Sequence, residues 1–368
     1  LRKAIIQGEM EMRVAIIAHG LSDGGAERVA SITANYFVSI GHEVLYIAVY
    51  SPEREYHLDS RVKYYYADYK KKNKMMRFIS RSEQVARQIK KFDSDIAVSF
   101  LIKETFYASV LNVAPIVYSL RIDPADVMRK KSNAFFCKYC YGRSPAVIFQ
   151  TKDARDYFSD KIRENGVVIG NPLTNDLPYW NVENHEKTVI TACRLTEQKN
   201  LKMLINGFAL FHKVHPEYRL KIYGKGPELE RMQKLCLELQ IEAAVEFPGY
   251  SKNIHQVMSK SGIFALTSDF EGLSNSMLEA LAIGLPTVCT DCPPGGAAEY
   301  IRDGENGMLI PVGDVNAFYH KLCMLADDPA LCKRMSQSSQ RIRETLDEKK
   351  VMEQWNRVIQ SVIKQQEE

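Results

Sequence analysis

The sequence predicts an α/β protein made of two tandem Rossmann-like, doubly wound domains that face each other across a cleft. Its 368 residues exceed one ordinary core, since single hydrophobic cores usually stop growing near about 250 to 300 residues. Short β-branched runs alternate with helical patterns, which is typical of parallel βαβ units. This alternation restarts after residues 171–181, a stretch rich in Asn, Asp and Pro that indicates an interdomain linker.

Each predicted strand is a short apolar run. In the first half these runs are Arg13–Ala18, Glu43–Val49, Asp95–Leu101, Pro115–Leu120 and Ala146–Thr151. In the second half they are Thr188–Cys193, Tyr218–Tyr223, Val245–Phe247, Gly262–Thr267, Pro286–Thr290 and Met308–Pro311. We therefore expect an upstream extension at 1–11, a first domain at 12–170, a linker at 171–186, a second domain at 187–345, and a C-terminal helix at 346–368 that can cross back to the first domain.

The composition is that of an average globular protein, with 45% apolar and 26% charged residues. No apolar run approaches the roughly 20 residues that span a bilayer, and the first residues lack the features of a secretion signal. We therefore expect a cytoplasmic protein. Two Cys-x-x-C pairs, Cys137/Cys140 and Cys289/Cys292, lie too far apart in sequence for a zinc ribbon. The eight cysteines are interpreted as reduced core thiols.

Positive charge is concentrated in the first half of the chain. Residues 1–180 contain 27 Lys and Arg against 20 Asp and Glu. The excess gathers around Lys70–Lys74 and Arg129–Lys138, where cations alternate with large apolar side chains. Such segments suit the surface of an anionic membrane, and a solvated helix face is the alternative. No nucleic-acid-binding motif accompanies the charge, so no nucleic-acid partner is expected.

The first strand leads into a Gly24-Gly25 pair that opens a helical pattern. A helix N-terminus suits an anionic group such as a phosphate, and an ordinary strand-to-helix turn is the alternative. The fingerprint G-x-G-x-x-G is absent, which argues against a classical dehydrogenase.

Several loops in the second half follow predicted strands directly. Arg194 and Lys199 lie on one such loop, where two cations can neutralise a diphosphate without a metal. Taken singly, each could equally be a surface charge. Gly224 and Gly249-Tyr250 end two further strands in glycine turns, and the backbone of the Gly249-Tyr250 turn can frame a flat base.

The densest polar segment runs from Thr267 to Val288. Glu271 precedes a predicted helix and Glu279 lies two turns inside it, up to about 12 Å away along the axis. This separation is too long for the paired carboxylates of a glycosidase, which are about 5 to 9.5 Å apart. The two carboxylates suit two different parts of one long ligand. A core ion pair for Glu279 and an ordinary helix-start acid for Glu271 are the alternatives.

In combination, these motifs resemble glycosyltransferase family 4, retaining enzymes with the GT-B fold. The resemblance is carried by Glu271-x7-Glu279 in a Phe-Glu-Gly-Leu-Ser context, Arg194 with Lys199, Gly24-Gly25, and the glycine-rich segment 294–307. It covers nearly the whole chain from Met12.

The resemblance implies a nucleotide-diphosphate sugar held mainly by the second domain. The implied donor contacts are Arg194 and Lys199 with the diphosphate, Glu271 with the sugar hydroxyls, Glu279 with the ribose, the amides of Gly272, Leu273 and Ser274 with phosphate and sugar, Gly224, Gly249 and Tyr250 with the nucleotide, and Gly24 and Gly25 closing from the first domain. Arg194, Lys199 and Glu271 are the implied catalytic residues. Neither a metal nor another cofactor is implied.

The acceptor is expected on the first domain. Arg121 and Asp123 follow a predicted strand and are candidate acceptor contacts, with a helix-entry turn as an equal alternative. The resemblance implies transfer of a hexose or N-acetylhexosamine, from a UDP-sugar, to a glycan or lipid-linked glycan at the inner face of the cell membrane. The other functions considered are a nucleotide-sugar epimerase or phosphorylase on the same scaffold and a non-catalytic nucleotide-sugar-binding protein.

Overall fold

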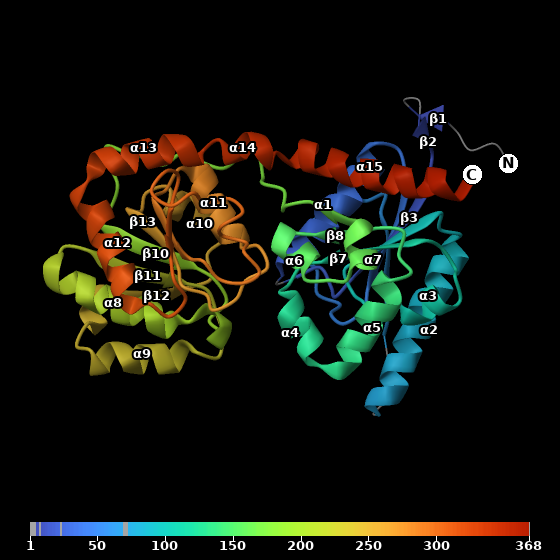
Figure 1. The fold of residues 1–368 in the computed structure, drawn as a ribbon, viewed down its shortest axis with the longest axis horizontal. Coiled ribbons are helices and arrows are strands. Elements are labelled where there is room, and N and C mark those ends of the chain that lie inside the picture. Colours follow the sequence, from blue (N-terminus) through green and yellow to red (C-terminus); the bar gives the residue numbers. More distant parts are fainter. Residues whose placement is uncertain (1–4, 7–8, 23, 69–72, 368) are drawn as a thin grey trace. The chain divides into compact units, whose positions relative to one another are not determined.

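The computed structural model describes residues 5–6, 9–22, 24–68 and 73–367 (Figure 1). The chain divides into two compact units. The first comprises Leu1–Pro172 with Lys349–Glu368, and the second comprises Leu173–Glu348. We call them the first and the second domain. The C-terminal helix α15 (Glu348–Glu367) lies almost wholly in the first domain, where Trp355 is fully buried and stacks on Phe100 with 5.8 Å between ring centroids.

The first domain is built on seven parallel strands in the order β5-β4-β3-β6-β7-β8-β9. The strands are β3 (Arg13–Ala18), β4 (Glu43–Ala48), β5 (Lys63–Tyr66), β6 (Ile96–Ser99), β7 (Ile116–Leu120), β8 (Val147–Phe149) and β9 (Gly166–Val168), and a separate two-stranded ribbon pairs β1 (Ile5–Ile6) with β2 (Glu9–Met10). The order runs outward in both directions from β3, which is the mark of a doubly wound sheet. Its reversal point lies between β3 and β6.

The helices of the first domain follow the strands. They are α1 (Gly25–Ser39), α2 (Lys74–Phe92), α3 (Phe106–Val110), α4 (Pro124–Arg129), α5 (Lys131–Tyr141), α6 (Lys152–Asp156) and α7 (Asp160–Glu164). Val85 of α2 and Tyr141 of α5 share one core with Ile17 and Tyr118 of the sheet. The helices that follow or contain the basic segments Lys70–Lys74 and Arg129–Lys138 therefore contribute residues to this core.

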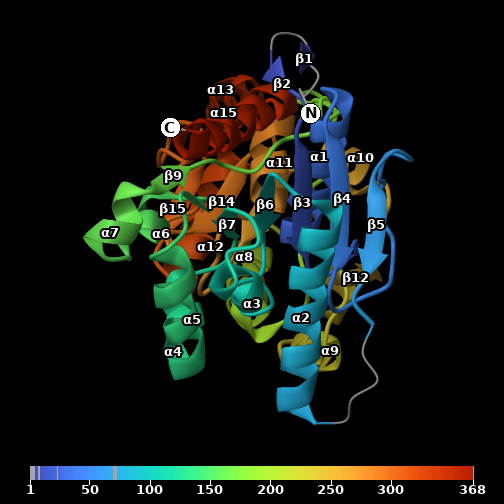
Figure 2. The ribbon, with the colours of Figure 1, turned by 90° about the vertical axis from the view of Figure 1, so that its right-hand side faces the viewer.

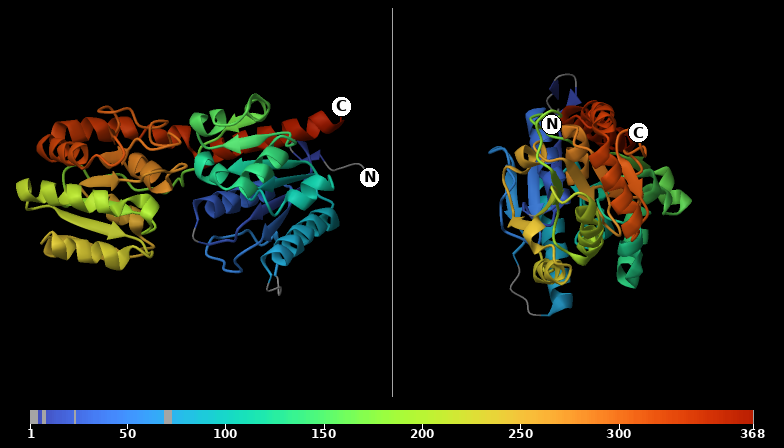
Figure 3. Two further views of the ribbon diagram at one scale, coloured as in Figure 1. Left: turned by 60° about the horizontal axis from the view of Figure 1, so that its bottom comes forward. Right: turned by 90° about the vertical axis from the view of Figure 1, so that its left-hand side faces the viewer.

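The second domain repeats the design with six parallel strands in the order β12-β11-β10-β13-β14-β15. The strands are β10 (Thr188–Ala192), β11 (Arg219–Tyr223), β12 (Val245–Gly249), β13 (Ile263–Leu266), β14 (Thr287–Thr290) and β15 (Met308–Ile310). The helices are α8 (Leu201–Val214), α9 (Leu229–Glu238), α10 (Ile254–Met258), α11 (Asn275–Ile283), α12 (Val315–Asp327), α13 (Pro329–Ser339) and α14 (Ile342–Thr345). Helices flank each sheet on both faces (Figure 3). The prediction of two doubly wound domains is confirmed.

The sequence missed the edge strands β5 and β9. Residues of β5 are exposed or half-buried, and the same holds for β9. A strand that is not buried on both faces lacks the continuous apolar run by which the inner strands were recognised. All six strands of the second sheet were predicted to within a few residues.

All eight cysteines are free. Six of them are buried, as the interpretation as core thiols predicts, whereas Cys193 and Cys323 are half-buried. Burial raises the pKa of the Cys193 thiol to about 11 and that of Cys292 to about 12. We expect Ellman's reagent at about pH 8 to label these thiols slowly in the folded protein, because about one in a thousand or fewer is ionised. All eight should react at once after unfolding. Rapid labelling of Cys193 or Cys292 in the native protein would contradict this burial.

No helix in the described ranges combines the length and the apolar character needed to cross a bilayer.

Candidate active site

The candidate site lies at the carboxyl ends of β10 and β13, the two central strands between which the second sheet reverses its order. Loops after such strands diverge to opposite faces of the sheet, which leaves room for a ligand at that edge. The loop after β10 carries Arg194 and Lys199, and the loop after β13 carries Glu271. Topology thus brings together the three predicted catalytic residues, which are up to 77 positions apart in the sequence.

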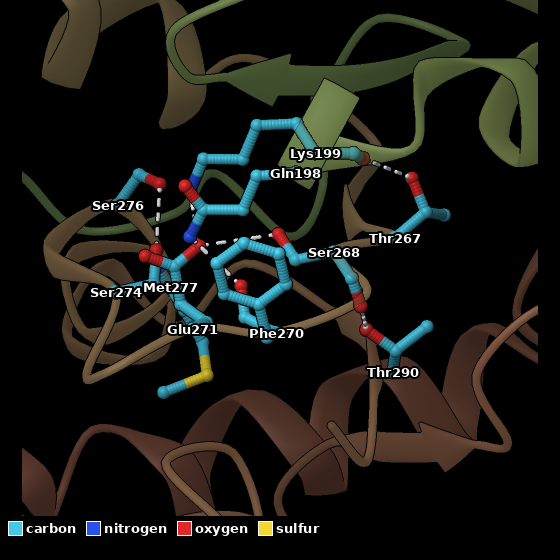
Figure 4. Close-up of polar contacts among 10 residues, drawn as sticks. All are labelled: Gln198, Lys199, Thr267, Ser268, Phe270, Glu271, Ser274, Ser276, Met277 and Thr290. Atoms are coloured by element: carbon cyan, nitrogen blue, oxygen red, sulfur yellow. Dashed lines mark hydrogen bonds and ion pairs between the residues drawn. The ribbon is translucent and has the colours of Figure 1, made fainter. Parts of the chain in front are cut away.

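Lys199 and Glu271 form an ion pair between the Lys199 Nζ and the Glu271 Oε2. Both side chains are largely shielded from water, with 8% of the lysine and 18% of the glutamate side chain exposed. The hydroxyl of Ser268 also donates to Glu271 Oε2 at 3.2 Å (Figure 4). A buried charge needs a partner, and each of these two groups supplies the opposite charge that the other requires.

Polar contacts between the two loops fix the pair in place. Gln198 Nε2 donates to the carbonyl of Phe270 at 2.8 Å, and the Asp269 amide donates to the carbonyl of Gln198 at 2.9 Å. Asn200 Nδ2 donates to Asp269 Oδ1 at 2.6 Å. On the far side, Thr290 donates its hydroxyl proton to the carbonyl of Ser268 at 2.6 Å. The loops therefore form one preorganised unit (Figure 4).

Arg194 differs from Lys199 in its surroundings. Its side chain is exposed, and no ion pair forms there within the described part of the chain. The two cations predicted to bind the diphosphate thus lie on the same loop. The Lys199 side chain is buried in it, whereas the Arg194 side chain is exposed to solvent.

The segment between the two glutamates ends at the start of α11. Ser274 is its N-cap, and its hydroxyl accepts from the Met277 amide at 3.4 Å. Gly272 is packed against Gly296, where an added Cβ would lie 2.3 Å from the Gly272 carbonyl oxygen. Leu273 is buried. A helix start at this edge gives the partial positive charge that an anionic ligand requires.

Glu279 lies on α11 with 8% of its side chain exposed. Its Oε2 is 3.2 Å from Nε2 of His255, which comes from the neighbouring helix α10. Glu279 therefore has an imidazole partner that the sequence did not indicate.

The predicted glycine turns bring the loops after β10, β11 and β12 together. Gly224 has a φ of +130°, and an added Cβ would lie 1.8 Å from the carbonyl oxygen of Cys193. Its amide donates to the carbonyl of Gly249 at 2.9 Å. Tyr250 follows as an exposed ring. Only glycine allows this close approach of backbones.

Local structure accounts for several predicted residues of the first domain. Gly24 is the N-cap of α1 and Gly25 is its first residue; their closing on a donor stays a prediction. Arg121 donates to Asn171 Oδ1 at 2.7 Å and lies over the Trp355 ring. Asp123 is buried and caps α4 by accepting from the Ala125 amide at 2.9 Å. For Asp123 the geometry is that of the helix-entry turn considered above.

Among the described residues, no three His, Cys, Asp or Glu side chains lie close enough together to hold a metal ion. Asp93-Ser94-Asp95 does have an Asp-x-Asp spacing. Asp93, however, pairs with the Arg13 guanidinium at 2.6 Å, and Asp95 accepts from the Arg13 amide at 2.7 Å. These carboxylates secure the start of β3, at the opposite end of the strand from Gly24.

Comparison with known proteins places this geometry in context. Residues 175–342 match the family model "Glycosyl transferases group 1". An uncharacterized glycosyltransferase of Haemophilus influenzae is 24% identical over 347 residues, covering 92% of this chain and 97% of that protein. The solved structure of Anabaena Alr3699/HepE in complex with UDP and glucose superposes with a TM-score of 0.80 at 17% identity, covering 95% of this chain and 100% of that one. The solved structure shows that the chain has the GT-B fold, and the family match and the relative support a glycosyltransferase.

One further relative matches over a shorter span. It is the N-acetylgalactosamine-N,N'-diacetylbacillosaminyl-diphospho-undecaprenol 4-alpha-N-acetylgalactosaminyltransferase of Campylobacter jejuni, 31% identical over 166 residues that cover 45% of this chain and 44% of that protein. The residues matched by the family model, 175–342, contain every predicted donor-binding residue of the second domain, from Arg194 to Glu279.

The sequence analysis did not single out several polar residues that make tertiary contacts in the two domains. In the second domain these are Gln198, Asn200, Asp269 and His255. In the first domain, His19 stacks on Tyr50 with 4.8 Å between ring centroids, Arg81 lies 4.1 Å from the centre of the Tyr50 ring, and Tyr50 donates to Glu104. His19, Tyr50 and Glu104 follow β3, β4 and β6, respectively. The one available signal was their position just after predicted strands.

Proposed function

We propose that this glycosyltransferase is a retaining, metal-independent enzyme of family 4 that transfers a hexose or N-acetylhexosamine from a UDP-sugar to a glycan or lipid-linked glycan in the cytoplasm. The observation that carries the proposal is the shielded Lys199 ammonium beside Glu271, at the reversal point of the second sheet. A preorganised cation at such an edge stabilises the negative charge of a departing diphosphate.

Donor binding exchanges the partner of Lys199. Without donor, Lys199 and Glu271 neutralise each other. A diphosphate carries more negative charge than one carboxylate, so it competes for the ammonium, and Glu271 becomes available to a sugar hydroxyl. Arg194, exposed on the same loop, supplies a second cation to the diphosphate.

Transfer with retention then requires one bond to break and one to form on the same face of the sugar. The bond from the anomeric carbon to the β-phosphate oxygen breaks, and its electrons stay with the diphosphate. The acceptor hydroxyl oxygen bonds to that carbon, and its proton passes to the departing diphosphate. Lys199 and Arg194 stabilise the charge that develops on the leaving group.

The named relatives support the choice of donor and acceptor. The Anabaena protein was solved with UDP and glucose, which supports a UDP-sugar. The name of the Campylobacter protein specifies a diphospho-undecaprenol acceptor, which supports an acceptor carried on a lipid.

A donor screen followed by product analysis tests the proposal. UDP-, GDP- and ADP-sugars are compared for thermal stabilisation, because a ligand that binds only the folded state raises its melting temperature. The donor selected is then supplied with radiolabel in the sugar. Release of UDP with transfer or hydrolysis supports a glycosyltransferase. An epimerised sugar still attached to UDP would indicate an epimerase, and stabilisation without any turnover a binding protein.

We expect His255→Ala to raise the KM for the UDP-sugar by up to about tenfold with a smaller change in kcat, because it removes a charge-assisted partner of Glu279. Ribose contacts are made equally in the ground and transition states, so their loss appears in KM. His255→Gln keeps a hydrogen-bond donor and should recover part of the loss. Steady-state kinetics over a range of donor concentrations measure the split. An equal fall in kcat for both variants would contradict a role through donor binding.

A further inference from the structure

One end of the first domain presents large apolar side chains to water. At the start of α2, Met75 is 70% and Met76 49% exposed, and on α5 Phe135 is 58% exposed. The start of α2 and the junction between α4 and α5 lie at the same, lower end of this domain in both Figure 1 and Figure 2. We call this surface the basic apolar face, made of Lys74, Met75, Met76, Arg129, Lys130, Lys131, Phe135 and Lys138. Lys70, Lys71 and Lys72 lie outside the described residues.

An aromatic cluster packs beneath the exposed side chains of this face. Phe78 of α2 contacts Phe136 of α5 with 5.5 Å between ring centroids, and Phe106 of α3 contacts the same ring at 5.0 Å. Phe135 rests on Phe106 at 6.1 Å. Phe135 is therefore the outer member of a packed cluster, presented to solvent by the fold rather than by a loose loop.

The segments that carry these apolar side chains also carry exposed cations. Lys74, Arg129, Lys130, Lys131 and Lys138 are exposed. The segments 73–78 and 129–138 contain no carboxylate. Arg129 pairs with Asp126 at 2.9 Å, so one acidic neighbour reduces the local charge, while the adjacent Lys130 and Lys131 repel each other. An exposed apolar patch flanked by cations is typical of a surface that binds a partner with apolar and negatively charged groups.

We propose that the basic apolar face docks on an anionic lipid bilayer. Phenylalanine and methionine side chains suit the boundary between headgroups and acyl chains, and the cations suit anionic headgroups. An acidic protein would match the charges but gives no reason for the apolar centre. Docking would hold the first domain at the surface that carries a lipid-linked acceptor; this benefit rests on the proposed function, whereas the docking itself does not.

Vesicle sedimentation of the full chain tests the proposal without any donor or acceptor. Vesicles of phosphatidylcholine are compared with vesicles of equal parts phosphatidylcholine and phosphatidylglycerol. Two variants change the face: Lys130→Gln/Lys131→Gln removes charge, and Met75→Ser/Phe135→Ser removes apolar area. Their matched controls make equivalent changes at exposed residues of the second domain, Lys333→Gln/Arg334→Gln and Leu237→Ser.

The wild-type chain is expected to bind the anionic vesicles and to leave phosphatidylcholine largely free. Each cation near the headgroups contributes about fivefold, so the double charge variant should bind about 25-fold more weakly. The apolar variant should also bind more weakly, and the controls should bind as wild type. Donor hydrolysis should remain unchanged in all four variants, since these side chains lie outside the catalytic loops. The melting temperature should remain unchanged in the charge variant and in both controls, whereas Met75→Ser/Phe135→Ser should lower it slightly because Phe135 contacts Phe106.

Three results would overturn docking. Both face variants could bind vesicles like the wild type. The apolar variant alone could bind the anionic vesicles like the wild type, which would mean that only electrostatic attraction holds the protein on the vesicle. Phe135→Ser could instead change the size of the protein in solution without affecting vesicle binding, which would make the face an interface between copies of the chain. Loss of sugar transfer with intact vesicle binding would count against the proposed function only.

Discussion

Replacing Lys199 by alanine is expected to lower kcat/KM for sugar transfer by about 10² to 10³, the range seen when one donor that stabilises transition-state charge is removed. The reason is that Lys199 is the shielded cation at the reversal point of the second sheet. Arg194→Ala should lower kcat/KM by a similar factor. Initial rates of transfer, measured with the donor identified in the screen, give both values. Near-normal transfer by both variants would refute the assignment of the diphosphate site.

Stability separates the catalytic role of Lys199 from its structural one. Lys199→Ala leaves Glu271 largely shielded without its cation, which should cost about 3 kcal/mol of unfolding free energy. Arg194 is exposed, so Arg194→Ala should leave stability unchanged. The double variant Lys199→Ala/Glu271→Gln removes both charges and should regain much of the lost stability while remaining inactive. Regained activity in the double variant would mean that Lys199 serves only to neutralise Glu271.

Gly224→Ala is expected to destabilise the second domain by about 3 kcal/mol or more, as for other substitutions at a strained backbone position. An added Cβ would lie 1.8 Å from the Cys193 carbonyl oxygen, so the loops after β10 and β11 would have to separate. The displaced loop carries Arg194 and Lys199, so stabilisation by UDP-sugar should also be lost. Urea unfolding and thermal shift with donor measure the two effects.

Gly313→Ala is the matched control for backbone conformation. Gly313 also has a positive φ, +77°, but an added Cβ would meet nothing within 4 Å. Its cost should be limited to the left-handed conformation itself, about 1 to 2 kcal/mol. If Gly224→Ala and Gly313→Ala cost the same, close packing against Cys193 would not be the reason for glycine at position 224.

Most of the fold could be predicted because the inner strands of a doubly wound sheet are buried on both faces. Burial on both faces requires a continuous apolar run, as in Arg13–Ala18 and Ile263–Leu266, and such a run is visible in sequence. The edge strands β5 and β9 are only partly buried, so their sequences carry no such run. The helix that became α11 was also predicted, because an apolar pattern follows the polar loop after β13, whereas Ser274 was identified as its N-cap only in the structure.

The candidate site could be predicted in its residues but not in its pairings. Arg194, Lys199 and Glu271 were recognisable because polar residues that directly follow a buried strand must lie at one edge of the sheet. That Lys199 pairs with Glu271, that His255 approaches Glu279, and that Asp123 caps α4 depend on rotamers and on loop paths. The hydrophobic pattern of the sequence does not determine these rotamers and loop paths.

By itself, the sequence determined that two parallel sheets form and which loops carry charge, since burial and periodicity are properties of contiguous segments. Only the tertiary structure decided which charges meet, because partners 72 positions apart, such as Lys199 and Glu271, are brought together by strand order. Tertiary packing also decided which apolar residues of the basic segments remain exposed. Phe136 turns into the aromatic cluster while its neighbour Phe135 faces water, because successive residues of a helix point in different directions.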